Sequence, residues 1–546
     1  MPTAVTSSAE LERALRNLQA AKLPWARLPL AERIALLDRL PEDLHAVEQP
    51  WVAAALAARG AQPGSPAESE EWFSFSVIYR QLRYLRKSLS QIAAKGRPQM
   101  PGKLCWKTAG QWTVDVFPQT LADRLALPGI RAEVRARDNF NGDLPETAAF
   151  YQQAEPQGGL CLVLGAGNVN ALPAGDLLHK LFVEGKVVLL KLNPVNAYLD
   201  EWMQLAFGAL IEPGYLQIVQ GGADVGGELA AHPAVDEVHV TGSARTYAAL
   251  QGIGKPLSAE LGNVSPVIVV PGPWSTGDVR KQAAKYATSL VANAGFNCVT
   301  PRVFIQMEGW AQRQAFNQAL VDYLRGVPTR RAWYPGAAER QAAFVQKYPQ
   351  AQQIGGAGQG ELPWTYIPGL DSEAKDGTAF RQEAFCGLAV ETALPAENPI
   401  DFLHKAVQFA NQHLWGDLAA TIVVHPKSLQ DPLMEAAVQQ AITDLRYGTV
   451  VVNHWGALAF YLALTPWGAA PGNTPADIQS GVGMVSNPLM FAQPEKSVVQ
   501  APFLSFPDPY LAQSRRSYAY FRADARYQHR PNAGNLLRLL WAALRS

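Results

Sequence analysis

One stretch of the sequence, Asn293-Ala-Gly-Phe-Asn-Cys298, places a cysteine just after an Asn-x-Gly turn. A thiol on such a turn can act as a nucleophile once it loses its proton. It can equally be an unreactive core side chain, because free cysteine is among the most buried residue types. The residue type alone leaves both interpretations open, so the rest of the chain must decide between them.

Two glutamates stand in settings that suit chemistry. Glu260 begins the segment Glu260-Leu-Gly-Asn-Val-Ser-Pro266, where a glycine turn leads into a buried strand. A carboxylate there can be a general base if burial raises its pKa, whereas an ordinary loop glutamate is solvated. Glu383 is followed two residues later by Phe385, so a carboxylate and an aromatic ring lie close enough to hold a ribose and a planar ring.

Glycine turns between strands and helices indicate a nucleotide site. Gly165-Ala-Gly167 follows a predicted strand, and a second strand ends in Val240-Thr-Gly-Ser243. Backbone amides at such turns bind anions, although a plain strand-to-helix connection has the same pattern. Asn170 replaces the third glycine of the usual dinucleotide fingerprint, and Lys191, not an acid, ends the next strand. Lys191 can hold a ribose or phosphate, or can be a solvated strand end.

The elements that must position these residues alternate between strand and helix. From residue 158 to 241 and again from 267 to 453, short apolar runs alternate with helical patterns, which predicts two parallel α/β units. Residues 8–95 are predicted to be helical, and residues 130–136 alternate apolar and charged residues as a half-exposed strand does. The expected fold is therefore α/β, with a doubly wound nucleotide-binding domain, a second α/β catalytic domain and a small bridging or oligomerisation β element.

Composition excludes several other classes of protein. The chain has 546 residues, of which 48% are hydrophobic, and it carries 47 basic and 47 acidic residues. Its net charge of zero gives no field to attract nucleic acid. The four cysteines form no CxxC or Cys/His cluster, so we expect no metal site and no disulfide framework, as in the reducing cytoplasm. There is no signal peptide pattern, and no apolar run approaches the roughly 18 residues of a membrane span.

Taken in chain order, these features resemble the aldehyde dehydrogenase superfamily over roughly residues 120–495. The resemblance implies NAD(P)-dependent oxidation of an aldehyde to a carboxylic acid through a cysteine thiohemiacetal and a thioester. It implies Cys298 as the nucleophile, Glu260 as the general base and Asn168 as the oxyanion donor. The residues implied to bind the cofactor, NAD or NADP, are Lys191, Gly222, Gly242, Ser243, Glu383 and Phe385.

The sequence also departs from the family pattern. Asn263 replaces the second glycine after Glu260, and Ala166-Gly167 replaces the Pro-Trp before Asn168. Pro194 replaces an acid that would bind the adenosine 2'-hydroxyl, which makes NADP at least as credible as NAD. Cys386-Gly387 replaces a Gly-Pro pair after Phe385. Two alternatives therefore stay open: an acylating, coenzyme A-dependent enzyme or acyl reductase, and a non-catalytic nucleotide-binding relative. The presence of Glu260 favours hydrolysis.

We expect residues 1–125 and 153–259 to form the cofactor-binding domain and residues 260–447 the catalytic domain. Segments 126–152 and 485–505 are expected to be bridging or oligomerisation strands of a homodimer or homotetramer. Residues 506–546 are expected to form a C-terminal tail. The pattern from residue 532 onwards predicts an amphipathic helix that could dock on the body or on a membrane surface. Trp455, Phe460 and Tyr461 suggest an apolar or aromatic aldehyde, although core packing explains them equally well.

Overall fold

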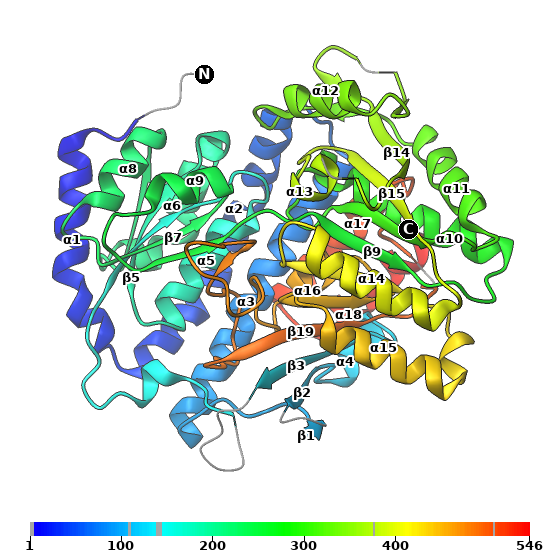
Figure 1. Cartoon of the computed structure of the whole chain (residues 1–546). Coiled ribbons are helices and arrows are strands. Elements are labelled where there is room, and N and C mark those ends of the chain that lie inside the picture. The colour runs from blue at the N-terminus through cyan, green and yellow to red at the C-terminus, as the bar shows by residue number, and fades with distance from the viewer. Residues whose placement is uncertain (1–4, 108–110, 138–144, 357, 375–376, 506–507) are drawn as a thin grey trace.

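Two twisted sheets, each with helices packed on it, organise the chain in the computed structural model (Figure 1). The structure describes residues 5–107, 111–137, 145–356, 358–374, 377–505 and 508–546. The predicted α/β fold with a doubly wound nucleotide-binding part is confirmed. No helix within those ranges combines the length and apolarity that crossing a membrane requires.

The smaller sheet has the strand order β18-β8-β7-β4-β5-β6. Its strands from β8 to β6 run parallel, whereas β18 is antiparallel to β8. Strand β5 is buried along its whole length, as expected of a parallel strand with both faces covered. The strands are β4 (Leu160–Leu164), β5 (Val187–Leu192), β6 (Leu216–Gln220), β7 (Glu237–Thr241), β8 (Leu257–Glu260) and β18 (Gly481–Val482). The helices between them are α5 (Ala171–Phe182), η2 (Pro194–Leu199), α6 (Asp200–Ala206), α7 (Gly208–Ile211), α8 (Ala223–Ala231) and α9 (Ala244–Leu250).

The larger sheet has the order β1-β2-β3-β19-β17-β16-β9-β10-β15-β14-β12. Its central strands from β19 to β14 are parallel, and antiparallel strands flank them on both sides. The strands are β1 (Leu104–Lys107), β2 (Gln111–Phe117), β3 (Arg131–Arg137), β9 (Ser265–Val269), β10 (Pro301–Met307), β12 (Gln352–Ile354), β14 (Trp364–Leu370), β15 (Leu388–Leu394), β16 (Ala419–Val423), β17 (Thr449–Val452) and β19 (Pro494–Gln500).

The two segments expected to bridge subunits contain strands that pair with each other, β3 and β19. Residues 138–144 of the first segment lie outside the described residues. Strands β1 and β2 extend the same antiparallel edge, although they lie within the segment expected to bind the cofactor. Strand β1 pairs locally with β2, and β2 pairs with β3, which lies some 20 residues further along the chain, so local sequence does not reveal that these strands join this sheet.

Further helices join the strands of the larger sheet, and β11 and β13 form a separate two-stranded sheet. These helices are η3 (Ala292–Gly295), α10 (Thr276–Val291), α11 (Arg313–Arg325), α12 (Ala337–Lys347), α13 (Thr378–Arg381), α14 (Pro399–His413), η4 (Ser428–Gln430), α15 (Pro432–Asp444) and α16 (Ala457–Leu462), and the short strands are β11 (Arg330–Arg331) and β13 (Glu361–Leu362).

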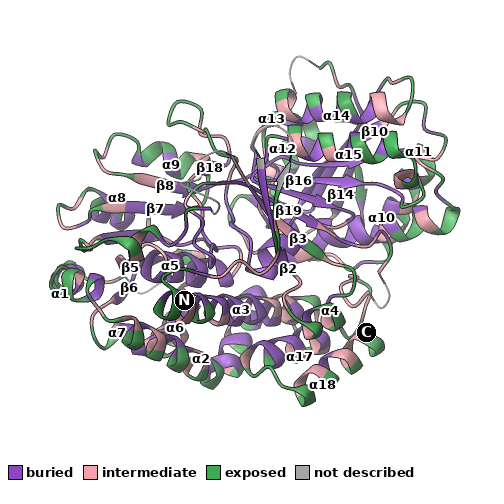
Figure 2. Cartoon of the chain, turned by 90° about the horizontal axis from the view of Figure 1, so that it is seen from below, coloured by how far each residue is buried: buried purple, intermediate pink, exposed green. Residues whose placement is uncertain are grey.

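Helices from the two ends of the chain lie together beneath both sheets (Figure 2). Helix α17 (Ser517–His529) packs along α3 (Pro66–Lys95), and α18 (Ala533–Arg545) contacts α17 and α4 (Leu121–Ala126). The remaining helices are α1 (Ser8–Ala26), α2 (Leu30–Arg59) and η1 (Ala149–Gln152). The predicted amphipathic helix at the end of the tail is confirmed as α18, which buries Leu539 and exposes Trp541.

A buried ion pair fixes α17 against α3. Arg80 Nη2 lies 3.2 Å from Asp524 Oδ1, and the Tyr461 hydroxyl donates to Asp524 Oδ2 at 2.6 Å. The Arg80 guanidinium also lies over the Tyr461 ring, 4.5 Å from its centroid. Because Arg80 and Asp524 are 2% and 0% exposed, neither charge can be solvated if its partner is removed.

We expect Asp524→Ala to lower the free energy of unfolding by about 3 to 5 kcal/mol, because it leaves Arg80 buried without a counter-ion. The matched control is Asp38→Ala. It removes the ion-pair partner of Arg86, which lies on α3 as Arg80 does. That pair is about half exposed, so its loss should cost no more than about 1 kcal/mol. Urea unfolding at pH 7.5 measures both, and equal effects would contradict the expectation.

Candidate active site

The cysteine turn is held in an unusual backbone conformation. Asn293, Ala294 and Gly295 have φ angles of 53°, 55° and 79°, so three consecutive residues are left-handed. Glycine is needed at the third position, because a Cβ there would lie 2.4 Å from the backbone carbon of Cys386. The turn therefore reverses the chain sharply between α10 and Cys298.

Three side chains hold this turn in place. Arg302, at the start of β10, donates to the carbonyls of Gly295 at 2.8 Å and of Cys386. The Asn293 side chain donates to the Asn168 carbonyl at 2.8 Å, and the Asn293 backbone N–H donates to Glu70 Oε1 at 2.6 Å. The turn is thus tied to the larger sheet, to the smaller sheet and to helix α3.

The predicted nucleophile and the predicted base are in direct contact. Cys298 Sγ donates to Glu260 Oε1 at 3.3 Å, across the junction between the two sheets. Burial, and secondly the charge of Asp176, raise the pKa of Glu260 to about 7. Burial, followed by the charges of Glu260 and Glu383, raises the pKa of the Cys298 thiol well above its ordinary value. Cys298 is therefore a protonated thiol whose nearest base titrates close to neutrality.

Asn168 lies at the same site as this pair. It is 6% exposed and lines the same cavity as Cys298. Its Nδ2 donates to the Phe296 carbonyl at 3.0 Å, two residues before the cysteine. An amide nitrogen carries two protons, so the second remains to donate to an oxygen bound beside the thiol.

Glu383 lies beside the Glu260 loop. A Cβ on Gly262 would lie 1.9 Å from Glu383 Oε2, so the glycine after Glu260 and Leu261 leaves room for this carboxylate. Burial raises the pKa of Glu383 to about 7, and the Arg302 charge acts in the opposite direction. Glu383 Oε1 has no hydrogen-bond partner among the described residues. A buried carboxylate oxygen of this kind fits the hydroxyl of a bound ribose.

Phe385 extends this part of the site as a ring held from several sides. Its ring centroid lies 6.0 Å from that of Phe296 and 5.0 Å from that of Tyr334, while Arg340 donates to its carbonyl at 3.2 Å. Its φ angle of 42° is unusual for an aromatic residue. The ring therefore has a fixed position close to the cysteine turn, where a planar ring could pack on it.

The other predicted cofactor residues lie at the carboxyl ends of strands in the smaller sheet. Lys191 is in β5, and burial lowers its pKa whereas the charge of Asp224 acts to raise it. A Cβ on Gly226 would lie 3.7 Å from Lys191 Cδ, so α8 passes close to the lysine stem. Gly222 precedes α8 and Ser243 caps α9, accepting from Thr246 N at 3.2 Å. Gly242, between them in the chain, donates its N–H to the Glu260 carbonyl at 3.0 Å. This edge of a parallel sheet is where nucleotides bind in doubly wound folds.

A cavity of about 440 Å³ leads to Cys298. Its wall is formed by α3, the end of α10, residues 327–333, α16 and residues 510–521, so both ends of the chain contribute. Trp455 and Phe460 line it, as expected for substrate-binding residues. Tyr461 instead stacks on Phe73, 5.3 Å between centroids, and donates to Asp524.

Two arginines of the cavity wall are paired with glutamates, whereas Arg331, which also lines the cavity, is exposed. Arg330 donates to both carboxylate oxygens of Glu70 at 2.6 and 2.8 Å, and Arg59 Nη1 lies 2.7 Å from Glu71 Oε1. The rest of the wall is largely apolar, including Leu172, Val299, Phe521 and the two aromatic residues above.

Several residues that shape the site were absent from our sequence predictions. Arg302 stands four residues after Cys298, in a segment predicted to be a strand. A buried arginine in such a strand is unusual, so the sequence could have identified it as a site residue. Asp176 was another, because it is the only acid in the apolar helix Ala171–Phe182. Glu70 and Tyr510 gave no signal, since they reach the site only through the packing of distant helices.

Comparison with protein families agrees with this geometry. A family model described as the aldehyde dehydrogenase family matches residues 131–357. The chain is 33% identical over 186 residues to N-succinylglutamate 5-semialdehyde dehydrogenase of Sphingopyxis alaskensis, and 27% identical over 321 residues to the enzyme of that name from Escherichia coli. These matches cover 32% and 58% of this chain, and they span only 38% and 54% of the relatives' own lengths.

Solved structures resemble the chain over a longer range. A mutant of aldehyde dehydrogenase C from Pseudomonas syringae, in complex with NAD+ and octanal, aligns with a TM-score of 0.64 at 18% identity, covering 92% of this chain and 90% of that one. An NADP-dependent glyceraldehyde-3-phosphate dehydrogenase from Bacillus halodurans, in complex with NADP, aligns with a TM-score of 0.62 at 16% identity, covering 91% and 92%. At these identities the similarity establishes the fold.

We expect Glu260→Gln to lower the pKa of the Cys298 thiol by about one unit or more, because it removes a negative charge from beside a buried thiol. Thiolate absorbance in the ultraviolet, measured against pH and corrected with Cys298→Ala, reports this value directly. If the pH midpoint of thiolate absorbance in Glu260→Gln equals or exceeds that of the wild type, the side chains of Cys298 and Glu260 are not in contact in solution.

Proposed function

We propose that the chain is a member of the aldehyde dehydrogenase superfamily, which the family match over residues 131–357 and the similar solved structures support, and that it oxidises an aldehyde to a carboxylic acid with NAD or NADP. The observation that carries the proposal is the contact between Cys298 Sγ and Glu260 Oε1, with Asn168 lining the same cavity. A thiol, a base with a pKa near 7 and an amide donor are the three groups that covalent oxidation of a carbonyl requires.

In the first half of the reaction Glu260 accepts the thiol proton, and the Cys298 sulfur adds to the aldehyde carbon. The Asn168 amide and the Cys298 backbone N–H donate to the oxyanion that forms. One such donor is worth about 3 to 4 kcal/mol of transition-state stabilisation. When bound, the nicotinamide ring supplies the acceptor for the hydride that leaves this adduct, and a thioester of Cys298 results.

In the second half Glu260 accepts a proton from water, and the resulting hydroxide adds to the thioester carbon. The Cys298 sulfur then leaves and the carboxylic acid is released. Glu260 must be ionised to act in either half, so the rate is expected to fall below a pH of about 7. The acylating alternative, with coenzyme A as acceptor, would not need this base to activate water in the second half.

The cofactor would be held by both sheets. Lys191, Gly222, Gly242 and Ser243 lie at the strand ends where an adenosine and a pyrophosphate would bind. Glu383 and Phe385, on the other side of the site, would hold the nicotinamide ribose and pack on its ring. Pro194 provides no acid for the 2'-hydroxyl, so NADP remains as credible as NAD.

The substrate is proposed to be an apolar or aromatic aldehyde. Trp455, Phe460, Phe521 and Leu172 line the cavity, and two of its arginines, Arg59 and Arg330, are already paired with glutamates. Arg331 also lines the cavity but is exposed, so an unpaired substrate carboxylate would find no unpaired buried cation among the described residues of the wall.

We further propose a homodimer or homotetramer in the cytoplasm. The β1 strand is an edge of the larger sheet, and exposed edges of this kind favour pairing with a second chain. The bridging role of segments 126–152 and 485–505 belongs to this proposal. All four cysteines are free, which suits a reducing compartment.

Cys298→Ala should abolish NADH or NADPH formation while leaving dinucleotide binding intact, because the variant loses only the group that attacks the carbonyl. A panel of aromatic, aliphatic and carboxylated aldehydes, run separately with NAD and NADP, measures turnover, and cofactor fluorescence measures binding. Cys386→Ser, which alters another buried cysteine near Arg302, is the control and should keep its activity. Wild-type turnover in Cys298→Ala would end the proposal.

Glu260→Gln should slow release of the acid roughly a hundredfold or more, because the thioester then lacks a base to activate water. Stopped-flow absorbance should show that the first turnover of cofactor is affected less than the steady state. The acid limb of the rate near pH 7 should also disappear. If steady-state turnover is unchanged but becomes dependent on coenzyme A, the acylating alternative is correct.

A further inference from the structure

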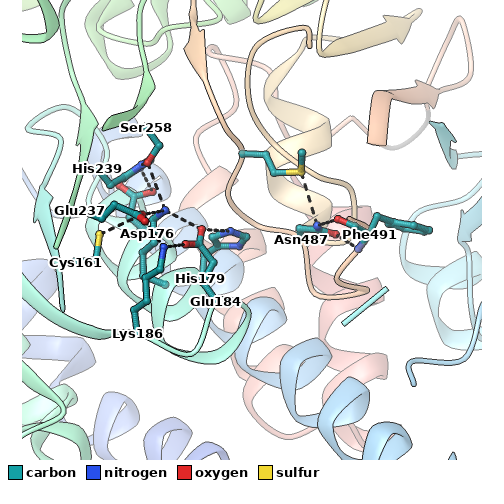
Figure 3. A network of polar contacts seen from close by, with 12 residues as sticks. Cys161, Asp176, His179, Glu184, Lys186, Glu237, His239, Ser258, Asn487 and Phe491 are labelled. Atoms are coloured by element: carbon teal, nitrogen blue, oxygen red, sulfur yellow. Dashed lines mark hydrogen bonds and ion pairs between the residues drawn. The ribbon is translucent and has the colours of Figure 1, made fainter. Parts of the chain in front are cut away.

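A line of polar side chains runs through the smaller sheet, between strands β7 and β8 and helix α5 (Figure 3). Side chains alternate along a strand, so every second residue faces α5. The register pairs His239 with Ser258 and Thr241 with Glu260, so the four side chains form two successive rungs on one face. We call these four residues and Asp176 of α5 the polar seam.

The inner end of the seam adjoins the catalytic base. Thr241, the register partner of Glu260, donates its hydroxyl to Asp176 Oδ2 at 2.8 Å. Asp176 is fully buried, and its Oδ1 has no hydrogen-bond partner in the described part of the chain. His239 Nε2 lies 3.3 Å from the Thr241 hydroxyl and 3.7 Å from Asp176 Oδ1. The negative charge of Asp176 contributes to the raised pKa of Glu260.

The outer end of the seam reaches the surface. His239 Nδ1 lies 2.9 Å from Ser258 Oγ, and Ser258 is half-buried. Lys180 Nζ donates to Ser258 Oγ at 3.4 Å, so the serine proton remains available for His239 or for solvent. Lys180 itself stays a cation, because Glu184 and Glu237 each accept from it at 2.7 Å.

Other titratable groups surround this outer end. Lys186 pairs with Glu184 and Glu237, His179 Nε2 lies 3.2 Å from Glu184 Oε1, and the Cys161 thiol donates to Glu237. These groups pair with one another within the described residues, and none of them bonds to Asp176 or His239 there. The seam meets this cluster through the Lys180–Ser258 contact. At its other end Glu260 is the neighbour of Thr241 by strand register, and no hydrogen bond joins the two side chains among the described residues.

The proposed reaction creates a need for such a line. An aldehyde, NAD+ and water give a carboxylate, NADH and two protons. Glu260 accepts one proton from the Cys298 thiol and must lose it before it can accept another from water. At the end of the cycle the departing Cys298 thiolate regains a proton and the carboxylic acid loses one, so two protons are released in total. Glu260 is 3% exposed, so it has little direct contact with solvent.

We propose that Asp176, His239 and Ser258 relay protons from Glu260 to the surface; this inference rests on the proposed function. The Glu260 carboxyl turns toward its register neighbour Thr241 and passes its proton through the Thr241 hydroxyl to Asp176. Asp176 then closes the 3.7 Å gap between its Oδ1 and His239 Nε2 and passes the proton on. His239 Nδ1 then gives a proton to Ser258, whose hydroxyl gives one to solvent. Each step breaks one O–H or N–H bond and forms another, and no electrons are transferred. These are positioning residues for Glu260, since none of them touches the substrate.

The test is His239→Gln, which keeps a hydrogen-bonding side chain but cannot carry a proton through a ring. We expect the first turnover of cofactor to be kept and the steady-state rate to fall roughly a hundredfold, the lower end of the range for a lost proton transfer. The solvent deuterium isotope effect on kcat should rise, and small buffers should partly restore the rate. The control is His179→Gln, a buried histidine of α5 that bonds Glu184 outside the seam.

A His239→Gln enzyme with wild-type kcat and isotope effect would overturn the relay. So would a loss of rate with neither an isotope effect nor buffer rescue, since that is what a purely structural role predicts. If His239→Gln does not fold, Ser258→Ala at the half-buried end replaces it in the same measurements, and the same outcomes support or overturn the relay.

A wild-type protein that reduces no cofactor would refute the proposed function, and the seam can still be tested without turnover. Asp176→Asn should lower the titration midpoint of the Glu260 carboxyl by about half a unit to one unit. Infrared absorbance against pH, taken as the difference from Glu260→Gln, measures this midpoint. If the midpoint of the Glu260 carboxyl is the same in Asp176→Asn as in the wild type, Asp176 does not act on Glu260 and the relay is overturned.

Discussion

The left-handed turn from Asn293 to Gly295 is the constraint on which the site depends. Three consecutive residues with positive φ are unfavourable by themselves, so the surrounding structure must hold them. Arg302, the Asn293 side chain and Glu70 do so from three different parts of the molecule. Because one of these bonds joins the turn to Asn168, the same interaction that stabilises the backbone also brings the amide donor beside the thiol.

Burial then determines the chemistry of the groups that the turn brings together. Glu260 and Glu383 both have pKa values raised to about 7, and each is raised first by burial. In water neither carboxylate would take a proton at neutral pH. The thiol, in contrast, becomes harder to ionise next to these two carboxylates, so it needs a base in contact with it. The junction of the two sheets supplies both the burial and the contact.

The sequence predicted the parts of the structure that depend on local pattern. The buried strands of both sheets, such as β4 and β17, are short apolar runs with turn residues at their ends, and the motifs near them, taken in chain order, resemble the aldehyde dehydrogenase superfamily. The sequence did not predict the pairing of β2 with β3, or the contribution of Glu70 and Tyr510 to the site, because these depend on contacts between distant segments. The seam residues His239 and Ser258 were visible as polar positions in apolar strands, but only the register showed that they face each other.

The cavity wall combines α3 with residues 510–521, which are separated by more than 400 positions in the chain. Contacts of such high sequence separation form late, since the entropy of closing the loop must be overcome before they stabilise anything. During synthesis on the ribosome both sheets can therefore acquire their strands while the cavity still lacks one side. A reactive thiol is then shielded from solvent and oxidants only after residue 521 has emerged and α17 has docked on α3.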